Sequence, residues 1–198
     1  MIKTSYNPKS ELNFSSISSA TNLDKHMKSF KNFLQEQTEL WGHHIDSQQK
    51  VFISVSPFIA VKNVKQTNNI KPDGLWYGCG DAWIQWVKME MPDDFEAVNY
   101  LYEVKLGNDI LKISNEDEFE SFEHEFLRQD TPVNGGLPDW GKIQKEGYNG
   151  IEICPYFWSK RMSSLWYYPW DVASGCVWNA NGISDVVLLK DKNDGIKV

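Results

Sequence analysis

The sequence has few cysteines, no long apolar run and no excess of positive charge, and each shortage excludes a class of protein. Its three cysteines, Cys79, Cys154 and Cys176, are an odd number without a Cys-x-x-Cys pair, so we expect reduced thiols rather than a disulfide framework or a zinc site. No apolar run approaches the roughly 20 residues of a membrane span. The formal net charge of −7 disfavours a protein that binds nucleic acid through its phosphate backbone.

Signal and motif patterns are lacking as well. Residues 1–20 are rich in Ser and Asn and show no basic stretch followed by an apolar one. We therefore expect a soluble protein with no membrane partner, either cytoplasmic or secreted as an effector without a cleaved signal peptide. The dinucleotide fingerprint, the P-loop, the nucleophile elbow and the His-Glu-x-x-His helix are all missing. His43, His44 and Asp46 have the composition of metal ligands, but adjacent histidines point in different directions, so we expect no metal there.

Aromatic residues, in contrast, are plentiful. Nine Trp, ten Phe and eight Tyr in a chain of 198 residues supply enough apolar area for one well-packed domain. We expect residues 1–21 to form a flexible lead-in and residues 22–198 to form a single α+β domain. Apolar residues spaced by three, four and seven positions predict an amphipathic helix from Leu23 to Trp41, ended by Gly42.

Strand and helix patterns alternate along the rest of the chain. Alternating and β-branched stretches predict strands at 50–56, 74–80, 99–106, 109–113, 148–154, 175–179 and 184–189. Helical spacing predicts helices at 82–90, 114–128 and 140–146. The sequence from Met91 to Asp94 predicts the end of the first of these helices, and Ser114 with Asp117 predicts a capping box for the second. The turn signal Gly107-Asn108 predicts a β-hairpin between strands 99–106 and 109–113.

The order of these elements carries a resemblance to a known family. A strand ending in Ser-Val-Ser-Pro is followed by Lys-Pro-Asp-Gly-Leu-Trp-Tyr-Gly and a helix, and later by Gly-Tyr-Asn-Gly-Ile-Glu-Ile and a closing apolar strand. From Val51 to Leu189 this order resembles the ADP-ribosyltransferase fold. The resemblance implies a split, curved mixed β-sheet with surrounding helices. It also implies a mono-ADP-ribosyltransferase-like enzyme that transfers ADP-ribose from NAD, its substrate, to a protein or nucleic-acid acceptor.

Carried over residue by residue, the resemblance implies a cofactor-binding group on two strands. Trp76 in Gly74-Leu75-Trp76-Tyr77 takes the place of the aromatic residue that stacks on nicotinamide, and Tyr77 lines the same end of the ligand. An aromatic face holds a flat cationic ring with about 0.5–2 kcal/mol, although a strand aromatic is equally often part of a core. Ser54 or Ser56 occupies the position where the family has His or Arg. A serine there bonds either a ribose hydroxyl or its own turn.

The same resemblance implies catalytic and phosphate-binding residues near the C-terminus. Ser174 falls in the position of the family's glutamate, and Asp171 is the nearest carboxylate to it. A carboxylate there stabilises the oxocarbenium-like state formed when the bond from ribose C1′ to nicotinamide breaks; the alternative for Asp171 is an exposed turn residue. Arg161 is the candidate for binding the pyrophosphate, and the alternative is a surface contact.

The stretch from Tyr156 to Trp170 allows a second interpretation of the whole protein. Its rings either line a groove for a sugar, a base or a peptide, as in a non-catalytic binding module, or form a core beneath a loop. A third interpretation is a small acidic protein that acts as an inhibitor through an exposed apolar patch. Cys79 and Cys176 have no neighbouring His in the sequence, and we expect both to be buried thiols.

Overall fold

The computed structural model describes residues 39–67, 69–131 and 135–194. Their elements, in chain order, are β1 (Glu39–Leu40), β2 (His43–His44), β3 (Lys50–Ser54), β4 (Leu75–Cys79), α2 (Ala82–Glu90), α3 (Pro92–Ala97), β5 (Tyr100–Leu106), β6 (Ile110–Ile113), α4 (Glu116–Phe126), β7 (Leu127–Arg128), β8 (Leu137–Pro138), α5 (Trp140–Lys145), β9 (Gly150–Ile153), α6 (Trp158–Arg161), β10 (Ser174–Val177), a 3-10 turn (Ala180–Gly182) and β11 (Ile183–Asp191). The chain is therefore a mixed α+β protein, as its sequence predicts.

Seven of the strands form one mixed sheet with the order β11-β5-β3-β4-β10-β9-β6. Neighbouring strands are antiparallel except β6 and β9, which run parallel. The pairing between β3 and β4 is short and comprises only Lys50–Cys79 and Val51–Gly78. Strands β11, β5 and β3 are thus joined to β4 by a narrow contact, and β10 joins β4 to β9 and β6 on the other side.

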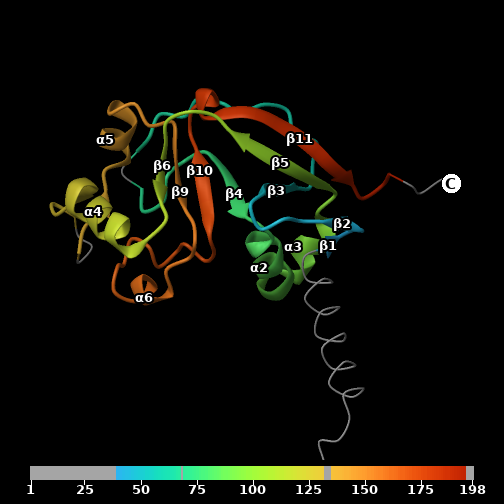
Figure 1. Ribbon diagram of the computed structural model, residues 1–198, viewed down its shortest axis with the longest axis horizontal. Helices are drawn as coiled ribbons and strands as arrows, with labels where there is room; N and C mark the ends of the chain where they lie inside the picture. Colours follow the sequence, from blue (N-terminus) through green and yellow to red (C-terminus); the bar gives the residue numbers. More distant parts are fainter. Residues whose placement is uncertain (1–38, 68, 132–134, 195–198) are drawn as a thin grey trace, which may run out of the picture. The chain divides into compact units, whose positions relative to one another are not determined.

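The sheet is strongly curled into a half-barrel, which Figure 1 shows from the side. β5 and β6 lie near opposite edges of the strand order, yet only residues 107–109 connect them. Because so short a segment cannot cross a flat seven-stranded sheet at about 4.8 Å per strand, the two edges must curve towards each other. The predicted hairpin between these strands is wrong: β5 pairs with β3 and β11, and β6 pairs with β9.

Helices cover the outer face of this half-barrel in two groups. Helices α4, α5 and α6 lie beside β6 and β9, and α2 and α3 lie below β3 (Figure 1). The first group encloses an aromatic core, in which Phe119, Trp140, Trp166 and Trp178 are at most 1% exposed. The second group covers a smaller core around Val51, Ile84 and Leu101. Burial of this much apolar area is the main stabilising contribution to the fold.

The inner face of the half-barrel carries its own apolar cluster, formed by strand residues. Tyr77, Val104 and Val177 are buried in it, and Leu106 and Ile110 from the two converging edges pack against them. The inner face is thus the side of the sheet that carries the side chains of Tyr77 and Glu152. The outer face is the side that the helices cover. Since side chains alternate along a strand, Trp76 belongs to the outer face and Tyr77 to the inner one.

Of three local predictions, two need correction and one is confirmed. The predicted lead-in, and the predicted helix from Leu23 up to residue 38, lie outside the described residues. Where this helix was predicted to end, β1 and β2 pair instead, and a turn at Trp41 and Gly42 connects them, with φ angles of 51° and 76°. Such left-handed angles end a helix. The predicted end of the helix at Met91–Asp94 is confirmed, since α2 ends at Glu90; Pro92 then begins the additional helix α3, because proline is favoured at a first helical position. The N-cap of α4 is Asn115, which accepts from the Glu118 amide, instead of Ser114.

No helix among the described residues combines the length and apolar character required to span a membrane.

Candidate functional site

A pocket of about 540 Å³ opens on the inner face where four strands of the half-barrel begin or end. β3 contributes Lys50, β4 contributes Cys79, β9 contributes Glu152, and β6 contributes Lys112. The remaining lining comes from neighbouring loops: Ser47, Gln48, Ser114, Cys154, Pro155 and Ala173. Its volume lies within the usual 300–1,000 Å³ of small-molecule sites.

Glu152 is the buried charged group of this pocket. It is 7% exposed and lies in a strand whose four residues are all buried. The Lys50 ammonium lies 3.0 Å from Glu152 Oε2, and the Tyr77 hydroxyl donates to the same oxygen at 2.9 Å. A buried carboxylate needs such partners, because an unpaired charge in the protein interior is costly. Lys50 and Tyr77 therefore supply these partners and fix the orientation of the Glu152 carboxylate.

The second oxygen of Glu152 faces the pocket. Both contacts of the carboxylate go to Oε2, and within the described chain Oε1 receives no hydrogen bond. Because Glu152 lines the pocket, Oε1 is the oxygen of this carboxylate that remains for a ligand there. A carboxylate with one oxygen held and the other open can accept a hydrogen bond from a ligand or stabilise positive charge on it.

Gly175 lets Tyr77 reach this carboxylate. β10 lies between β4 and β9, and Gly175 pairs with Tyr77 on one side and Glu152 on the other. A Cβ atom on Gly175 would lie 2.3 Å from the Tyr77 hydroxyl oxygen and 2.8 Å from the Ile151 carbonyl oxygen. Only a residue without a side chain permits Tyr77 to cross β10 here.

The electrostatics of the pocket favour an anion. Two lysines and one glutamate line it, so the pocket is locally positive within a chain of net charge −7. Lys112 is exposed and is the register partner of Glu152 in the parallel β6–β9 pair. It forms no ion pair with another described residue. Its ammonium is therefore available to a phosphate or carboxylate of a ligand.

Burial, together with the neighbouring Glu152 charge, raises the pKa of Tyr77 well above its usual 10.0. Desolvation is the larger cause, because ionisation would place a phenolate in an apolar cluster. Tyr77 consequently remains a hydrogen-bond donor across the physiological pH range.

Two cysteines of the pocket are joined, which corrects the expectation of reduced thiols. Cys79 and Cys154 form a disulfide between positions 75 residues apart, while Cys176 is a free, fully buried thiol, as expected. Among the described residues, Cys79, Cys154 and Glu152 form the group that could hold a metal ion, since their donor atoms lie within 4.8 Å of one another. Thiolates are the ligand form of cysteine, so the joined pair offers no such site.

The residues that the resemblance implies are divided between the two faces. Tyr77 lies on the inner face and bonds to Glu152 of the pocket lining, but Trp76 lies on the outer face against Trp170, with ring centroids 4.9 Å apart. The Lys71 ammonium lies 4.9 Å from the centroid of Trp76 and covers the ring face where nicotinamide would stack. Burial lowers the pKa of Lys71, and the neighbouring Asp171 carboxylate opposes this shift.

Asp171 and Arg161 form an ion pair near this cluster. Arg161 Nη2 lies 3.3 Å from Asp171 Oδ1, and each side chain is 24% exposed. The guanidinium also lies 5.2 Å from the Tyr168 ring centroid. Each of the two charges therefore has a partner within the chain.

The three candidate serines bond to their own backbone segments. Ser54 donates to the Ser56 carbonyl oxygen at 2.6 Å, and the Ser56 amide donates to the Ser54 hydroxyl. They lie at the end of β3, opposite the end that carries Lys50. Ser174 is 3% exposed and donates to the Val172 carbonyl oxygen. These contacts are those of turn and strand-end serines.

Most of the aromatic stretch from Tyr156 to Trp170 belongs to the core. Phe157, Trp166, Tyr167 and Trp170 are at most 7% exposed. Trp158 and Tyr168 differ, with 70% and 50% exposure. The stretch thus supplies both a core and a small aromatic surface.

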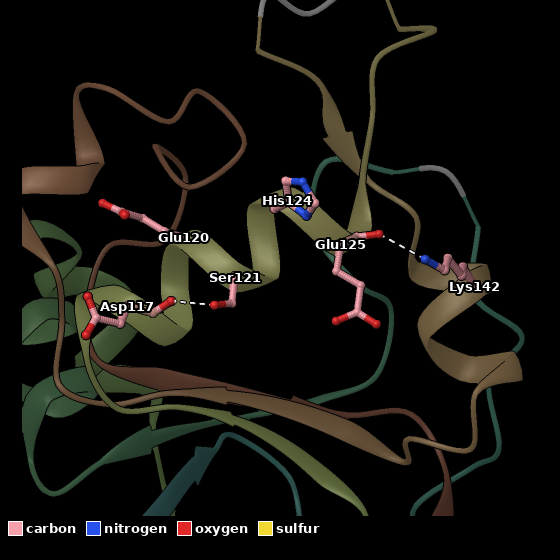
Figure 2. Close-up of a pocket in the computed structure, with 6 residues that line it drawn as sticks. All are labelled: Asp117, Glu120, Ser121, His124, Glu125 and Lys142. Carbon is pink, nitrogen blue, oxygen red and sulfur yellow. Dashed lines mark hydrogen bonds between the residues drawn. The ribbon is translucent and has the colours of Figure 1, made fainter.

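A second, larger hollow lies along the exposed side of α4. Figure 2 shows its lining: Asp117, Glu120, Ser121, His124 and Glu125 from α4 with Lys142 from α5. All six residues are exposed, and the carboxylates of Glu120 and Glu125 point in different directions (Figure 2). Ser121 and Lys142 bond to backbone oxygens of Asp117 and Glu125. These side chains do not converge on a common point, so we place the candidate site in the inner pocket.

Sequence reasoning missed Lys50, Lys112 and Glu152. The sequence does contain a signal for Glu152, which is the single charged residue in the apolar strand Gly150–Ile153. No comparable signal marks Lys50 or Lys112, because lysine is common on exposed strands. Comparison of the chain with protein-family models, with curated proteins and with solved structures gives no match.

Proposed function

We propose that the inner pocket binds a phosphate-bearing nucleotide, with NAD as the first candidate, and that the protein breaks the glycosidic bond to transfer ADP-ribose. The observation that carries this proposal is the Glu152 carboxylate, with Oε2 held by Lys50 and Tyr77 and Oε1 open to a basic pocket. The proposal moves the catalytic role from Asp171 and Ser174 to the carboxylate of Glu152.

The chemistry of the bond explains this choice. Loss of nicotinamide from ribose C1′ creates an oxocarbenium-like state, in which positive charge grows on the sugar. A fixed carboxylate stabilises that charge without the cost of reorienting during the reaction. Glu152 is fixed by two partners, and Lys112 with the Ser114 hydroxyl can bind the pyrophosphate of the ADP-ribose group that is transferred.

The strand arrangement gives further support. The family resemblance implies a split sheet, and here β3 and β4 share two residue pairs before they separate. β3, β4 and β10, which contain the three motif positions of the resemblance, are neighbours in the strand order. No aromatic ring belongs to the pocket lining, so the proposal assigns no stacking partner to the nicotinamide.

The test measures binding and bond cleavage in the same preparations. The full chain is incubated with NAD, and released nicotinamide is quantified by chromatography, while calorimetry measures the binding of NAD and ADP-ribose. Glu152→Gln should lower the release rate by about 100-fold or more and leave ADP-ribose binding within a few-fold. Glu103→Gln, on the other face of β5, is the matched control and should behave as the wild type.

Lysine variants separate binding from cleavage. Lys112→Gln should weaken ADP-ribose binding by about tenfold, which corresponds to one lost phosphate contact of about 1.4 kcal/mol, whereas Lys105→Gln on the exposed side of β5 should not. Absence of nicotinamide release and of NAD binding at millimolar concentration would refute the proposal. So would a Glu152→Gln variant with wild-type release.

The exposed pair Trp158 and Tyr168 favours a second candidate, the non-catalytic binding module. Their rings flank the Arg161 guanidinium, at 6.0 Å and 5.2 Å from their centroids, and Trp, Tyr and Arg are the residues that dominate protein-binding surfaces. If this surface carries the function, the double variant Trp158→Ala with Tyr168→Ala should lose binding to the partner. No variant should then cleave NAD.

A further inference from the structure

The disulfide lines the inner pocket, and Cys79 lies at the edge of the apolar cluster of the inner face. Cys79 ends β4 and Cys154 follows β9, and both residues are partly exposed and line the pocket. The bridge passes the start of β10, where the Cys79 amide donates to the Ala173 carbonyl oxygen. A dissolved thiol that enters the pocket can therefore reach the sulfurs, whereas Cys176 is fully buried.

The surroundings of the two sulfurs differ. Lys50 is the strand partner of Cys79, and its ammonium lies 3.6 Å from Cys79 Sγ. A lysine at this distance stabilises a cysteine thiolate. Among the described residues, no lysine or arginine donates a hydrogen bond to Cys154 Sγ, and the Glu152 carboxylate lies within 4.8 Å of both sulfurs. Cys79 is therefore the better leaving group of the pair, because the thiolate that is stabilised leaves faster.

We propose that Cys79–Cys154 is a thiol-exchange site, at which a small thiol attacks Cys154 and displaces Cys79 as a thiolate held by Lys50. This inference concerns sulfur chemistry and does not depend on cleavage of NAD.

The exchange balances in two steps. The thiolate of the small thiol forms a bond to Cys154 Sγ, the Cys79–Cys154 bond breaks, and its electron pair leaves with Cys79 Sγ. A second molecule of the thiol then attacks the mixed disulfide on its outer sulfur and releases Cys154 as a thiolate. The two small thiols are thereby oxidised to their disulfide, and the protein disulfide is reduced to two thiols.

Reduction would also change the pocket itself. Lys50 contacts both Glu152 and Cys79. A new thiolate at Cys79 would compete with Glu152 for the same ammonium and add a negative charge to the pocket wall. Reduced protein should therefore bind anions in the pocket more weakly than oxidised protein.

The experiment follows the folded full chain in reduced glutathione. Samples are trapped over time with iodoacetamide and mapped by mass spectrometry. We expect glutathione first on Cys154, then alkylation of Cys79 and Cys154, and none on Cys176. Lys50→Met should slow the first step by about tenfold, as expected for loss of a charge that stabilises the leaving thiolate. Lys105→Met is the matched control, and Lys50→Arg, which keeps the charge, should react at close to the wild-type rate.

Three results would overturn the inference. The first is a disulfide that opens only after the chain has unfolded. Circular dichroism of the same samples monitors the unfolding. The second is the mixed disulfide on Cys79 instead of Cys154. The third is an unchanged rate in Lys50→Met with Lys50→Arg as the folded reference. Because none of these measurements uses NAD, failure here and failure of the proposed NAD cleavage are distinguishable.

Discussion

Trp76 and Tyr77 are adjacent in β4, yet they belong to two regions with different tasks. Trp76 packs on the outer face against Trp170, in a region where aromatic rings contact one another beneath helices. Tyr77 packs on the inner face and donates to a buried carboxylate. The outer face is stabilised mainly by apolar area, whereas the inner face holds charged groups that need specific partners. The buried charge of Glu152 costs stability, and the inner face retains it at the pocket.

We expect the largest loss of stability from a substitution in the aromatic core of the outer face. Trp170→Ala removes a ring that is 1% exposed and contacts Trp76, Trp166 and Tyr167. We expect a loss of about 3–5 kcal/mol in the free energy of unfolding, measured by urea denaturation. Trp158→Ala, at a residue 70% exposed, should change it by less than about 0.5 kcal/mol. Equal losses in the two variants would remove the distinction between core and surface rings.

The second-largest loss of stability is expected at Gly175, where the side chain of Tyr77 crosses β10 to reach Glu152. Gly175→Ala places a methyl group in contact with Tyr77, and we expect a loss of about 3 kcal/mol, at the upper end of overpacking effects. Gly141→Ala in α5 is the control, because a Cβ there meets its nearest atom at an ordinary 3.4 Å. It should stabilise the protein by about 0.5–1 kcal/mol, as helix propensity predicts. Thermal unfolding followed by circular dichroism measures both. A neutral Gly175→Ala would show that Tyr77 does not need this opening.

Tyr77→Phe tests the hydrogen bond on the inner face. Loss of a bond to a charged group should lower the free energy of unfolding by about 2 kcal/mol at pH 7. The pH dependence adds a second readout. The pKa of Tyr77 is raised in the folded state, so its contribution is complete below about pH 10 and declines above it, where only the unfolded state loses the proton.

The difference between wild type and Tyr77→Phe should therefore shrink as the pH rises from 10 towards the folded pKa, with a slope of up to about 1.4 kcal/mol per pH unit. Guanidinium titrations between pH 7 and 11 measure it. Other buried tyrosines titrate in both proteins and cancel in the difference. A difference that stays constant up to pH 11 would contradict the raised pKa.

The smallest effect is expected at the ion pair on the outer side. Asp171→Asn removes the partner of Arg161 in a pair that is 24% exposed on each side, and we expect a loss of less than about 1 kcal/mol. Nicotinamide release should be unchanged, in contrast to Glu152→Gln. A large loss of release in Asp171→Asn would return the acidic role to the residue that the family resemblance implies.

Much of the local structure follows from the sequence, and the pairing of strands does not. The strands and the inward face of α4, with Phe119, Phe122 and Phe126, follow from alternation and helical spacing. The hairpin at Gly107-Asn108 failed because a turn signal fixes a reversal of the chain but not the neighbours of each strand. β5 instead pairs with β3 and β11, whose longer ladder buries more backbone.

The site was less accessible to sequence reasoning for the same reason. Lys50, Glu152 and Lys112 become neighbours only through strand register, and Tyr77 reaches Glu152 because a glycine lies between them. The disulfide was missed because the count and spacing of cysteines say little about residues 75 positions apart. Tyr77 was selected on the family resemblance, and the structure gives it a contact that this resemblance does not describe.

The position of β10 has a consequence for how the chain acquires its shape during synthesis. Among the strands of the sheet, only β11 follows β10 in the chain, yet β10 lies between β4 and β9 and pairs with both. A nascent chain that ends before Ser174 carries Tyr77 and Glu152 on separate groups of strands. The two groups can therefore join into one sheet only after β10 has been synthesised.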